Sequence, residues 1–246
     1  MSFKLDHAVF FGRTWDECLG MFALKDTDLS GLRILDCPGG PDALVAEGIK
    51  RNLDILAVDP QYDMSIDVLA AQGRKEIVET MEQWQQDPGT AWDQEKADEF
   101  KRLKLEALNS FISAFGEHPE RYVFGSLPEL PFEDDSFDLA LSGNFLFVYA
   151  SVERGGLMSN DQLGLDFHLE AVRELVRVAS EVRMFPSFAV TGPPRRQEFV
   201  EPVMEALRSD GHQVDFVPAQ WVEGEFTEFN DLIRIRKAGR SGTQSS

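Results

Sequence analysis

The sequence predicts an α/β fold: a doubly wound, mostly parallel seven-stranded sheet with an antiparallel last strand and a helical insertion after the second strand. Three observations predict it. Short apolar runs alternate with helical patterns, which is typical of βα units that build a parallel sheet. Residues 61–119 interrupt this alternation with a wholly helical pattern. The last two apolar runs follow each other without a helix between them, which indicates an antiparallel pair at a sheet edge.

The first two strands are short apolar runs that end in turn-forming residues. Residues 33–36 form the first run, which ends at a Pro-Gly-Gly-Pro cluster before a helix over 42–50. Residues 53–58 form the second run, which ends at Asp59 and Pro60. Runs of this length, bounded by glycine and proline, are typical of buried strands. The two units are therefore expected to begin the parallel sheet.

The insertion contains two helical patterns with separate apolar faces. The first face is formed by Ile66, Leu69, Ile77, Met81 and Trp84, and the second by Phe100, Leu103, Ala107, Phe111 and Phe115. Residues 87–90 separate the two helices, and Thr90 is placed to cap the second. Because a compact α/β core needs only a short connection at this point, residues 61–119 are predicted to form a helical cap.

The second half of the chain resumes the strand pattern. Strands are expected over 121–124, 137–141, 181–185, 213–217 and 231–236, and helices over 161–178 and 197–209. Ser159 and Gln162 have the spacing of a capping box for the first of these helices. Residues 1–237 are predicted to form a single domain, and residues 238–246 a disordered tail.

The charge of the chain argues against several partners. Lys and Arg total 24 against 43 Asp and Glu, a formal net charge of -19 at pH 7. Such a charge repels phosphate backbones and anionic lipid headgroups, so neither nucleic acid nor a membrane surface is expected as a partner. The basic cluster of Lys101, Arg102 and Lys104 is interpreted as a solvated helix face.

The cytoplasm is the expected location. The two cysteines, Cys18 and Cys37, are too few for a disulfide framework and fit a reducing compartment. Residues 1–10 lack the apolar centre of a secretory signal, and no segment reaches the roughly 20 apolar residues that cross a bilayer. The histidines have no ligand-pair spacing, so no metal site is expected.

The candidate ligand site lies at the carboxyl ends of the parallel strands, where doubly wound folds bind their ligands. After the first strand the chain continues as Asp36-Cys37-Pro38-Gly39-Gly40-Pro41-Asp42. Its glycines allow a ligand to approach the backbone, although a plain strand-to-helix turn has the same pattern. Asp59 follows the second strand, where a carboxylate can accept both ribose hydroxyls or cap a turn. Together these segments predict an adenosine-type ligand, and NAD and S-adenosylmethionine (SAM) both qualify.

A third strand-end segment carries a family resemblance. Residues 125–138 read GSLPELPFEDDSFD and closely resemble the LPF-x-D-x-SFD signature that precedes the fourth strand of class I SAM-dependent methyltransferases, in particular the type 11 group. Asp36 with its glycine loop is similar to the first motif of that family, and Asp59 to its ribose-binding acid. Residues 141–144 match the end of its fourth strand. The resemblance covers residues 32–237 apart from the insertion.

The resemblance implies SAM as the cofactor and a set of residues that bind it. Asp36, Gly39 and Gly40 would lie near its methionine end, Asp59 at the ribose, Ser126 and Leu127 at the adenine, and Ser142, Gly143 and Asn144 between cofactor and acceptor. Cys37, Pro38 and Pro60 complete the expected cofactor-binding set. The first motif departs from the D-x-G-x-G-x-G pattern of the family, because Pro38 and Asp42 replace two glycines. Many relatives also have an acidic residue where Ser126 stands.

The function that the resemblance implies is methyl transfer from SAM to a small-molecule or protein acceptor, with a small molecule preferred and the insertion shaping its pocket. No catalytic residue is assigned, because SAM already carries an activated methyl group. The alternative is a non-catalytic SAM-binding or interaction protein, which the departures at Pro38 and Asp42 motivate; an NAD-linked oxidoreductase is third. Arg13 is expected to have a surface role, with contact to the cofactor carboxylate as the alternative, and Cys37 is expected to be a packed thiol rather than a nucleophile. Neither the acceptor nor the oligomeric state follows from the sequence.

Overall fold

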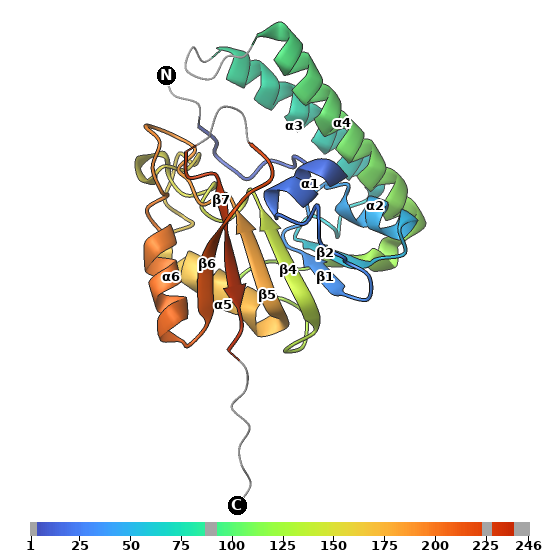
Figure 1. The fold of residues 1–246 in the computed structure, drawn as a ribbon. Coiled ribbons are helices and arrows are strands. Elements are labelled where there is room, and N and C mark those ends of the chain that lie inside the picture. The colour runs from blue at the N-terminus through green and yellow to red at the C-terminus, as the bar shows by residue number, and fades with distance from the viewer. Residues whose placement is uncertain (1–3, 87–92, 223–227, 239–246) are drawn as a thin grey trace, which may run out of the picture.

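The computed structural model describes residues 4–86, 93–222 and 228–238, and Figure 1 shows their arrangement. Seven strands within these residues form one sheet in the order β3-β2-β1-β4-β5-β7-β6. The strands are β1 (Arg33–Asp36), β2 (Asp54–Asp59), β3 (Tyr122–Phe124), β4 (Phe137–Gly143), β5 (Ala179–Phe185), β6 (Gln213–Pro218) and β7 (Asp231–Arg236). The helices are α1 (Trp15–Met21), α2 (Leu44–Lys50), α3 (Ile66–Gln86), α4 (Gln94–Glu117), α5 (Leu165–Val178) and α6 (Val200–Ser209), with 3-10 turns η1 (Pro119–Arg121) and η2 (Val152–Arg154).

The directions of strand pairing confirm the predicted sheet. β1 pairs in parallel with β2 and β4, and the parallel set continues outward to β3 and β5. β7 lies between β5 and β6 and runs antiparallel to both. In Figure 1 the dark red β7 therefore runs opposite to β4 and β5. The fold is the doubly wound, mostly parallel sheet with an antiparallel last strand.

Helices cover both faces of the sheet because successive strand residues point to opposite sides. Leu35 of β1 belongs to an apolar cluster that includes residues of α5 and α6. Its neighbour Ile34 belongs to a second cluster, on the face covered by α1, α2 and the insertion. Both residues are almost fully buried, so each face of the sheet is shielded from water. No helix in the described ranges combines the length and the apolar character needed to cross a bilayer.

The insertion after β2 folds into α3 and α4, which lie side by side in Figure 1. The two helices pack onto the core through Leu69 and Ile77 of α3 and Leu108 and Phe111 of α4, which are all fully buried. These residues join the same apolar cluster as α1 and α2. The helical insertion predicted after the second strand is therefore present, and it covers one face of the sheet as well as extending beyond it (Figure 1).

The boundaries of the insertion helices are only partly described. The side chain of Asp93 caps α4 by accepting a hydrogen bond of 2.9 Å from the Lys96 N–H. The expected helix break at residues 87–90, with Thr90 as the predicted cap, lies outside the described residues, as do residues 239–246 of the expected tail.

The start of α5 was predicted wrongly. The helix begins at Leu165, its N-cap is Gly164, and no side chain caps it. Ser159 and Gln162 do not form a capping box, because the Asn160 side chain accepts the Gln162 N–H at 3.1 Å in a tight turn before the helix. The capping-box spacing of Ser159 and Gln162 therefore occurs in a loop and does not mark the start of the helix.

Candidate functional site

The strand ends singled out by the sequence meet at one edge of the sheet. The pairing register places Asp36 of β1 beside Ala57 of β2 and Leu141 of β4. Because alternate residues of a strand share a face, Asp59 points to the same side as Ala57 and therefore as Asp36. The two carboxyl groups thus lie together on the face that is covered by α1, α2 and the insertion.

Two of the expected cofactor residues point to the other face. Cys37 packs in the apolar cluster of α5 and α6 with 1% of its surface exposed, which is the packed thiol that was expected. Burial raises the pKa of this thiol well above its ordinary value, and the carboxyl groups of Asp36 and Asp59 act in the same direction. Ser142 also points away from Asp36, since it alternates with Leu141, and its buried hydroxyl has no hydrogen-bond partner in the described residues.

The glycine loop after β1 is held against β2 by close packing. A Cβ atom on Gly39 would lie 2.7 Å from both the Ala57 Cβ and the Tyr62 Oη, so only glycine fits there. Gly40 has a left-handed φ of 47°, and a Cβ atom on it would meet no atom within 4 Å. The Tyr62 hydroxyl donates a hydrogen bond of 2.6 Å to the Gly40 carbonyl. Gly39 therefore serves packing, whereas Gly40 borders open space that a ligand can enter.

Asp59 ties the glycine loop to the end of β2. One carboxylate oxygen accepts the Gly40 N–H at 3.0 Å and the other accepts the Gln61 N–H at 2.9 Å. The side chain is 5% exposed, and burial raises the pKa of Asp59 to about 6 although the two N–H donors act in the opposite direction. The residue thus makes the turn contact expected of a capping acid and also holds the loop in place.

Asp36 is the carboxyl group at this edge that is least satisfied. It is 2% exposed, and its Oδ2 has no hydrogen-bond partner among the described residues. Burial raises the pKa of Asp36 well above its ordinary value, and the neighbouring carboxyl groups of Asp42 and Asp59 raise it further. Buried polar atoms are normally paired, so this oxygen indicates a binding partner. No group of three or more His, Cys, Asp or Glu side chains in the described ranges could hold a metal ion.

Arg13 is buried at the site, contrary to the surface position expected from the sequence. It is 8% exposed, and its backbone N–H donates a hydrogen bond of 2.5 Å to Asp42 Oδ1. In the amide orientation that satisfies both groups, Asn144 Oδ1 accepts from Arg13 Nε and Nη2 at 3.0 Å each. Burial raises the pKa of Asp42 to about 7, against the charge and the N–H bond of Arg13. Arg13 therefore connects the glycine loop to the end of β4.

A buried ion pair lies beside this arginine and links the insertion to α1. Lys104 of α4 and Glu17 of α1 are 2.5 Å apart, with side chains that are 0% and 1% exposed. Burial raises the Glu17 pKa, but the charges of Lys104 and Arg13 outweigh it and hold the pKa below its ordinary value. The Glu17 carboxylate also accepts the Thr14 N–H at 2.7 Å in a capping box that starts α1. The interpretation of Lys104 as part of a solvated face was therefore wrong.

The residues expected at the adenine form an exposed rim next to β2. The Gly125 N–H donates a long hydrogen bond of 3.4 Å to the Asp59 carbonyl, which keeps the turn after β3 close to the glycine loop. Ser126 is exposed and Leu127 is half-buried, and Pro60, which follows Asp59 in the chain, is also exposed. The structure thus brings these residues to the same end of the sheet as Asp36, on its β3 side.

Comparison with known proteins gives one curated relative and a group of solved structures. No protein-family model matches the chain. An uncharacterized protein of Methanocaldococcus jannaschii is 26% identical over 216 residues, which cover 87% of this chain and 92% of the relative. The similarity extends over most of both proteins.

Several solved structures that resemble the chain are described as SAM-dependent methyltransferases. A SAM-dependent methyltransferase from Aquifex aeolicus is 15% identical, with coverage of 88% of this chain and 89% of that one and a TM-score of 0.39. YcgJ from Bacillus subtilis is 13% identical, with coverage of 91% and 100% and a TM-score of 0.45. A SAM-dependent methyltransferase from Methanosarcina mazei is 12% identical, with coverage of 83% and 91% and a TM-score of 0.41. At these identities the likeness concerns the fold alone, and the strand order and directions described above define it as the Rossmann-like methyltransferase fold.

Proposed function

We propose that this protein binds SAM at the Asp36–Asp59 edge and transfers its methyl group to a small-molecule acceptor. The observation that carries the proposal is the buried Asp36 Oδ2 without a partner, beside the open space at Gly40. SAM has an α-ammonium group that matches such a carboxylate, and a ribose that matches Asp59. When bound, SAM supplies a methyl group already activated on a sulfonium.

The residues present fit this cofactor at its methionine end. Asp36 offers a carboxylate oxygen to an ammonium group, and the Gly39–Gly40 turn allows close approach to the backbone. Arg13 is a buried cation held between the glycine loop and Asn144, where it can offset the charge of a ligand carboxylate. Cys37 and Pro38 would contribute through their backbone, since the Cys37 side chain packs on the other face.

The ribose and adenine ends of SAM also fit, provided that the Asp59 oxygens each accept a second hydrogen bond. Each Asp59 oxygen already accepts one backbone N–H, and a carboxylate oxygen has capacity for a second donor, so ribose hydroxyls can bind without loss of the loop contacts. Ser126 and Leu127 would border the adenine, Pro60 would lie beside Asp59, and Ser142, Gly143 and Asn144 would separate the cofactor from the acceptor. The residues of the chain thereby bind and orient the reactants and exclude water, which is the main demand of methyl transfer.

The departure at Asp42 from the glycine pattern has a local explanation. Its carboxyl group accepts the Arg13 N–H and lies within the influence of two cations, Arg13 and Lys104. With a pKa raised to about 7, Asp42 is only partly ionised at neutral pH. Its charge therefore opposes a ligand carboxylate less than a surface aspartate would.

A non-catalytic SAM-binding protein is the second candidate, and the state of Asn144 favours it. Asn144 is the polar side chain at the end of β4, and its Oδ1 accepts two hydrogen bonds from Arg13. Ser142 points to the opposite face. Neither residue is therefore placed as a general base for an acceptor. Turnover of SAM to S-adenosylhomocysteine by the purified protein would decide against this candidate.

The proposal is tested by calorimetric titration with S-adenosylhomocysteine, compared between the wild type and Asp36→Asn. Removal of the carboxylate charge at constant shape is expected to weaken binding at least about tenfold, the equivalent of one charge-assisted hydrogen bond. The matched control is Asp166→Asn in the exposed first turn of α5, which is expected to bind as the wild type does. Absence of binding by the wild type at millimolar ligand, or equal affinity of Asp36→Asn, would contradict the proposal.

The proposal keeps the cytoplasm as the location, which the unpaired Cys18 and Cys37 support.

A further inference from the structure

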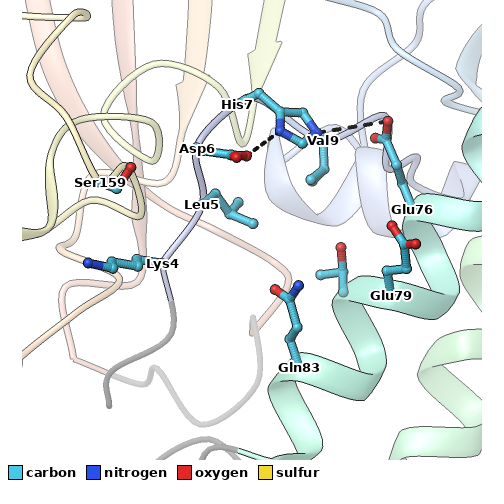
Figure 2. A pocket seen from close by; sticks show the side chains of 10 residues that line it. Lys4, Leu5, Asp6, His7, Val9, Glu76, Glu79, Gln83 and Ser159 are labelled. Carbon is cyan, nitrogen blue, oxygen red and sulfur yellow. Dashed lines mark hydrogen bonds and ion pairs between the residues drawn. The ribbon is translucent and has the colours of Figure 1, made fainter.

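A pocket of about 250 Å³ lies between the N-terminal segment and α3, outside the residues discussed so far (Figure 2). The N-terminal segment contributes Leu5, Asp6 and Val9 to its walls, and α3 contributes Glu76, Glu79 and Thr80. This volume suits a small metabolite, because pockets for larger organic ligands usually span about 300–1,000 Å³.

Three carboxyl groups line this pocket, and one of them, Glu79, pairs with Lys75 on the same helix at 3.8 Å. Figure 2 shows Glu76 and Glu79 projecting from successive turns of α3 on the side of the N-terminal segment. Asp6 lines the opposite wall and pairs with His7 at 2.5 Å, and Lys4 is the other cation that lines the pocket. Apolar contact comes from Leu5 and Val9 between these charges. Such a lining fits a cationic group on an aliphatic stem.

Glu76 is held in place by two hydrogen-bond donors. Its side chain is 12% exposed. One carboxylate oxygen accepts the Phe10 N–H at 2.5 Å and the other accepts the Gln72 side-chain amide at 2.8 Å. Both donors are neutral, and the His7 Nε2 lies 4.0 Å from the Oε1 of this carboxylate. The fixed carboxylate therefore presents negative charge that these donors do not neutralise.

Thr80 supplies an independent indication of a ligand. The residue lines the pocket and is only 8% exposed. Its hydroxyl forms no hydrogen bond to any of the described residues, so it is available to a group that enters the pocket. A hydroxyl in this position can accept a hydrogen bond from an ammonium group that lies between the two glutamates of the same helix.

The N-terminal segment that lines the pocket also reaches the proposed cofactor edge. The Val9 N–H donates to the Tyr149 hydroxyl at 3.2 Å, which joins the N-terminal segment to the chain that follows β4. Four residues later the same segment places Arg13 against Asn144 at the end of β4. A ligand in the pocket thus contacts the segment that also covers the edge between β1 and β4.

We propose that this pocket binds the ammonium group of a small aliphatic amine, which is the methyl acceptor. The proposal rests on the methyltransferase function proposed above and names its substrate class. In the reaction the amine nitrogen gives one proton to Glu79, which passes it on to solvent. Glu79 is the more exposed of the two glutamates, with 53% of its side chain exposed. The nitrogen lone pair forms the new N–C bond while the S–C bond of the sulfonium breaks. Sulfur keeps the electron pair of the broken bond. The products are the N-methylated amine and S-adenosylhomocysteine.

The test is a ligand-observed NMR titration of the full chain with n-butylammonium, in the absence of SAM, beside 1-butanol and butyrate. Binding of the ammonium is expected, and binding of the neutral or anionic probe is not. Glu79→Gln is expected to weaken n-butylammonium about tenfold and Thr80→Val about threefold. The matched control is Glu82→Gln, an exposed glutamate of α3 that does not line the pocket, which is expected to change affinity less than twofold.

Two results would overturn the inference. Equal affinity for n-butylammonium and 1-butanol would show that charge recognition is absent. An equal effect of Glu79→Gln and Glu82→Gln would show that the acidic surface attracts cations in general. Because the titration uses no SAM, its failure leaves the cofactor titration with Asp36→Asn unaffected, and failure of the cofactor titration leaves amine binding measurable. A rise in the KM for the amine in Glu79→Gln, with unchanged SAM affinity, is expected when both proposals hold.

Discussion

The Lys104 ammonium lies 2.5 Å from the Glu17 carboxylate, in a position where neither side chain reaches solvent. Lys104 belongs to the insertion and Glu17 to α1, the helix that follows Arg13. The ammonium also lies 4.6 Å from the centre of the Phe100 ring, a cation–π contact within α4. A pair of this kind fixes the insertion relative to the site, because separating the two charges leaves each of them buried without its partner.

Breaking this pair is expected to destabilise the protein strongly. Lys104→Met leaves the Glu17 carboxylate buried without its cation and is expected to lower the free energy of unfolding by about 3–5 kcal/mol. Urea denaturation followed by circular dichroism measures the change. Lys96→Met, at an exposed position in the first turn of the same helix, is the control and is expected to stay within about 0.5 kcal/mol of the wild type. A double variant with Glu17→Met is expected to lose less than the sum of the single losses, and simple additivity would contradict the coupling.

The stability is expected to fall between pH 4 and pH 7 through Asp42. Its folded pKa of about 7 exceeds the ordinary value of 3.8, so over this interval the folded state binds more protons than the unfolded state, and unfolding becomes easier as pH rises. Each pKa unit corresponds to about 1.4 kcal/mol. Asp42→Asn is therefore expected to gain stability relative to the wild type from pH 5 to pH 8, as measured by urea denaturation at both values. A constant difference between the two proteins would contradict the assignment.

His168 is expected to give the opposite dependence on pH. Burial lowers the pKa of His168, whose Nε2 accepts the Phe147 N–H at 3.0 Å and whose Nδ1 lies 2.8 Å from the Gly164 carbonyl. The folded state therefore favours the neutral ring, and its stabilising effect is complete above the ordinary pKa of 6.5 and is lost as pH falls below it.

The measurement for His168 compares His168→Gln with the wild type at pH 7.5 and pH 5. The variant is expected to be less stable by about 1–3 kcal/mol at the higher pH, because the Phe147 N–H loses its acceptor, and this deficit is expected to shrink at the lower pH. His118→Gln, at a half-exposed ring with 41% exposure, serves as the control for the loss of a histidine elsewhere. A deficit that stays constant with pH would show that the ring is not held neutral.

The sheet could be predicted from the sequence because its signal is local. The runs at 33–36 and 137–141 are apolar and bounded by turn residues, and both are strands in the structure. The end of α5 follows from the same periodicity, but its start at Leu165 does not, since the capping spacing of Ser159 and Gln162 occurs in a loop whose turn is made by another side chain. Local motifs of four residues are short enough to occur in segments that tertiary contacts shape differently.

The candidate site was predictable in part for a topological reason. Asp36 and Asp59 come at the carboxyl ends of adjacent parallel strands, so their proximity follows once the sheet order is known. The pairing of Lys104 with Glu17 follows from no local pattern, because the two residues lie far apart in the chain and meet only through packing of the insertion. One signal was present: Lys104 stands seven residues before Phe111, on the buried face of α4.

The two glycines of the loop after β1 are expected to respond differently to the same added methyl group. In Gly39→Ala the Cβ would lie 2.7 Å from Ala57 Cβ and Tyr62 Oη, so overpacking is expected to cost about 1–3 kcal/mol of stability. In Gly40→Ala no atom lies within 4 Å of the Cβ, and the cost is the left-handed φ of 47°, about 1 kcal/mol.

The methyl group added in Gly40→Ala would nevertheless occupy the open space assigned to the cofactor. Calorimetry with S-adenosylhomocysteine is therefore expected to show at least tenfold weaker binding for Gly40→Ala in a protein that remains folded, whereas Gly31→Ala, also at a left-handed φ but before β1, is expected to bind normally. Equal affinity of Gly40→Ala and Gly31→Ala would place the ligand away from this turn.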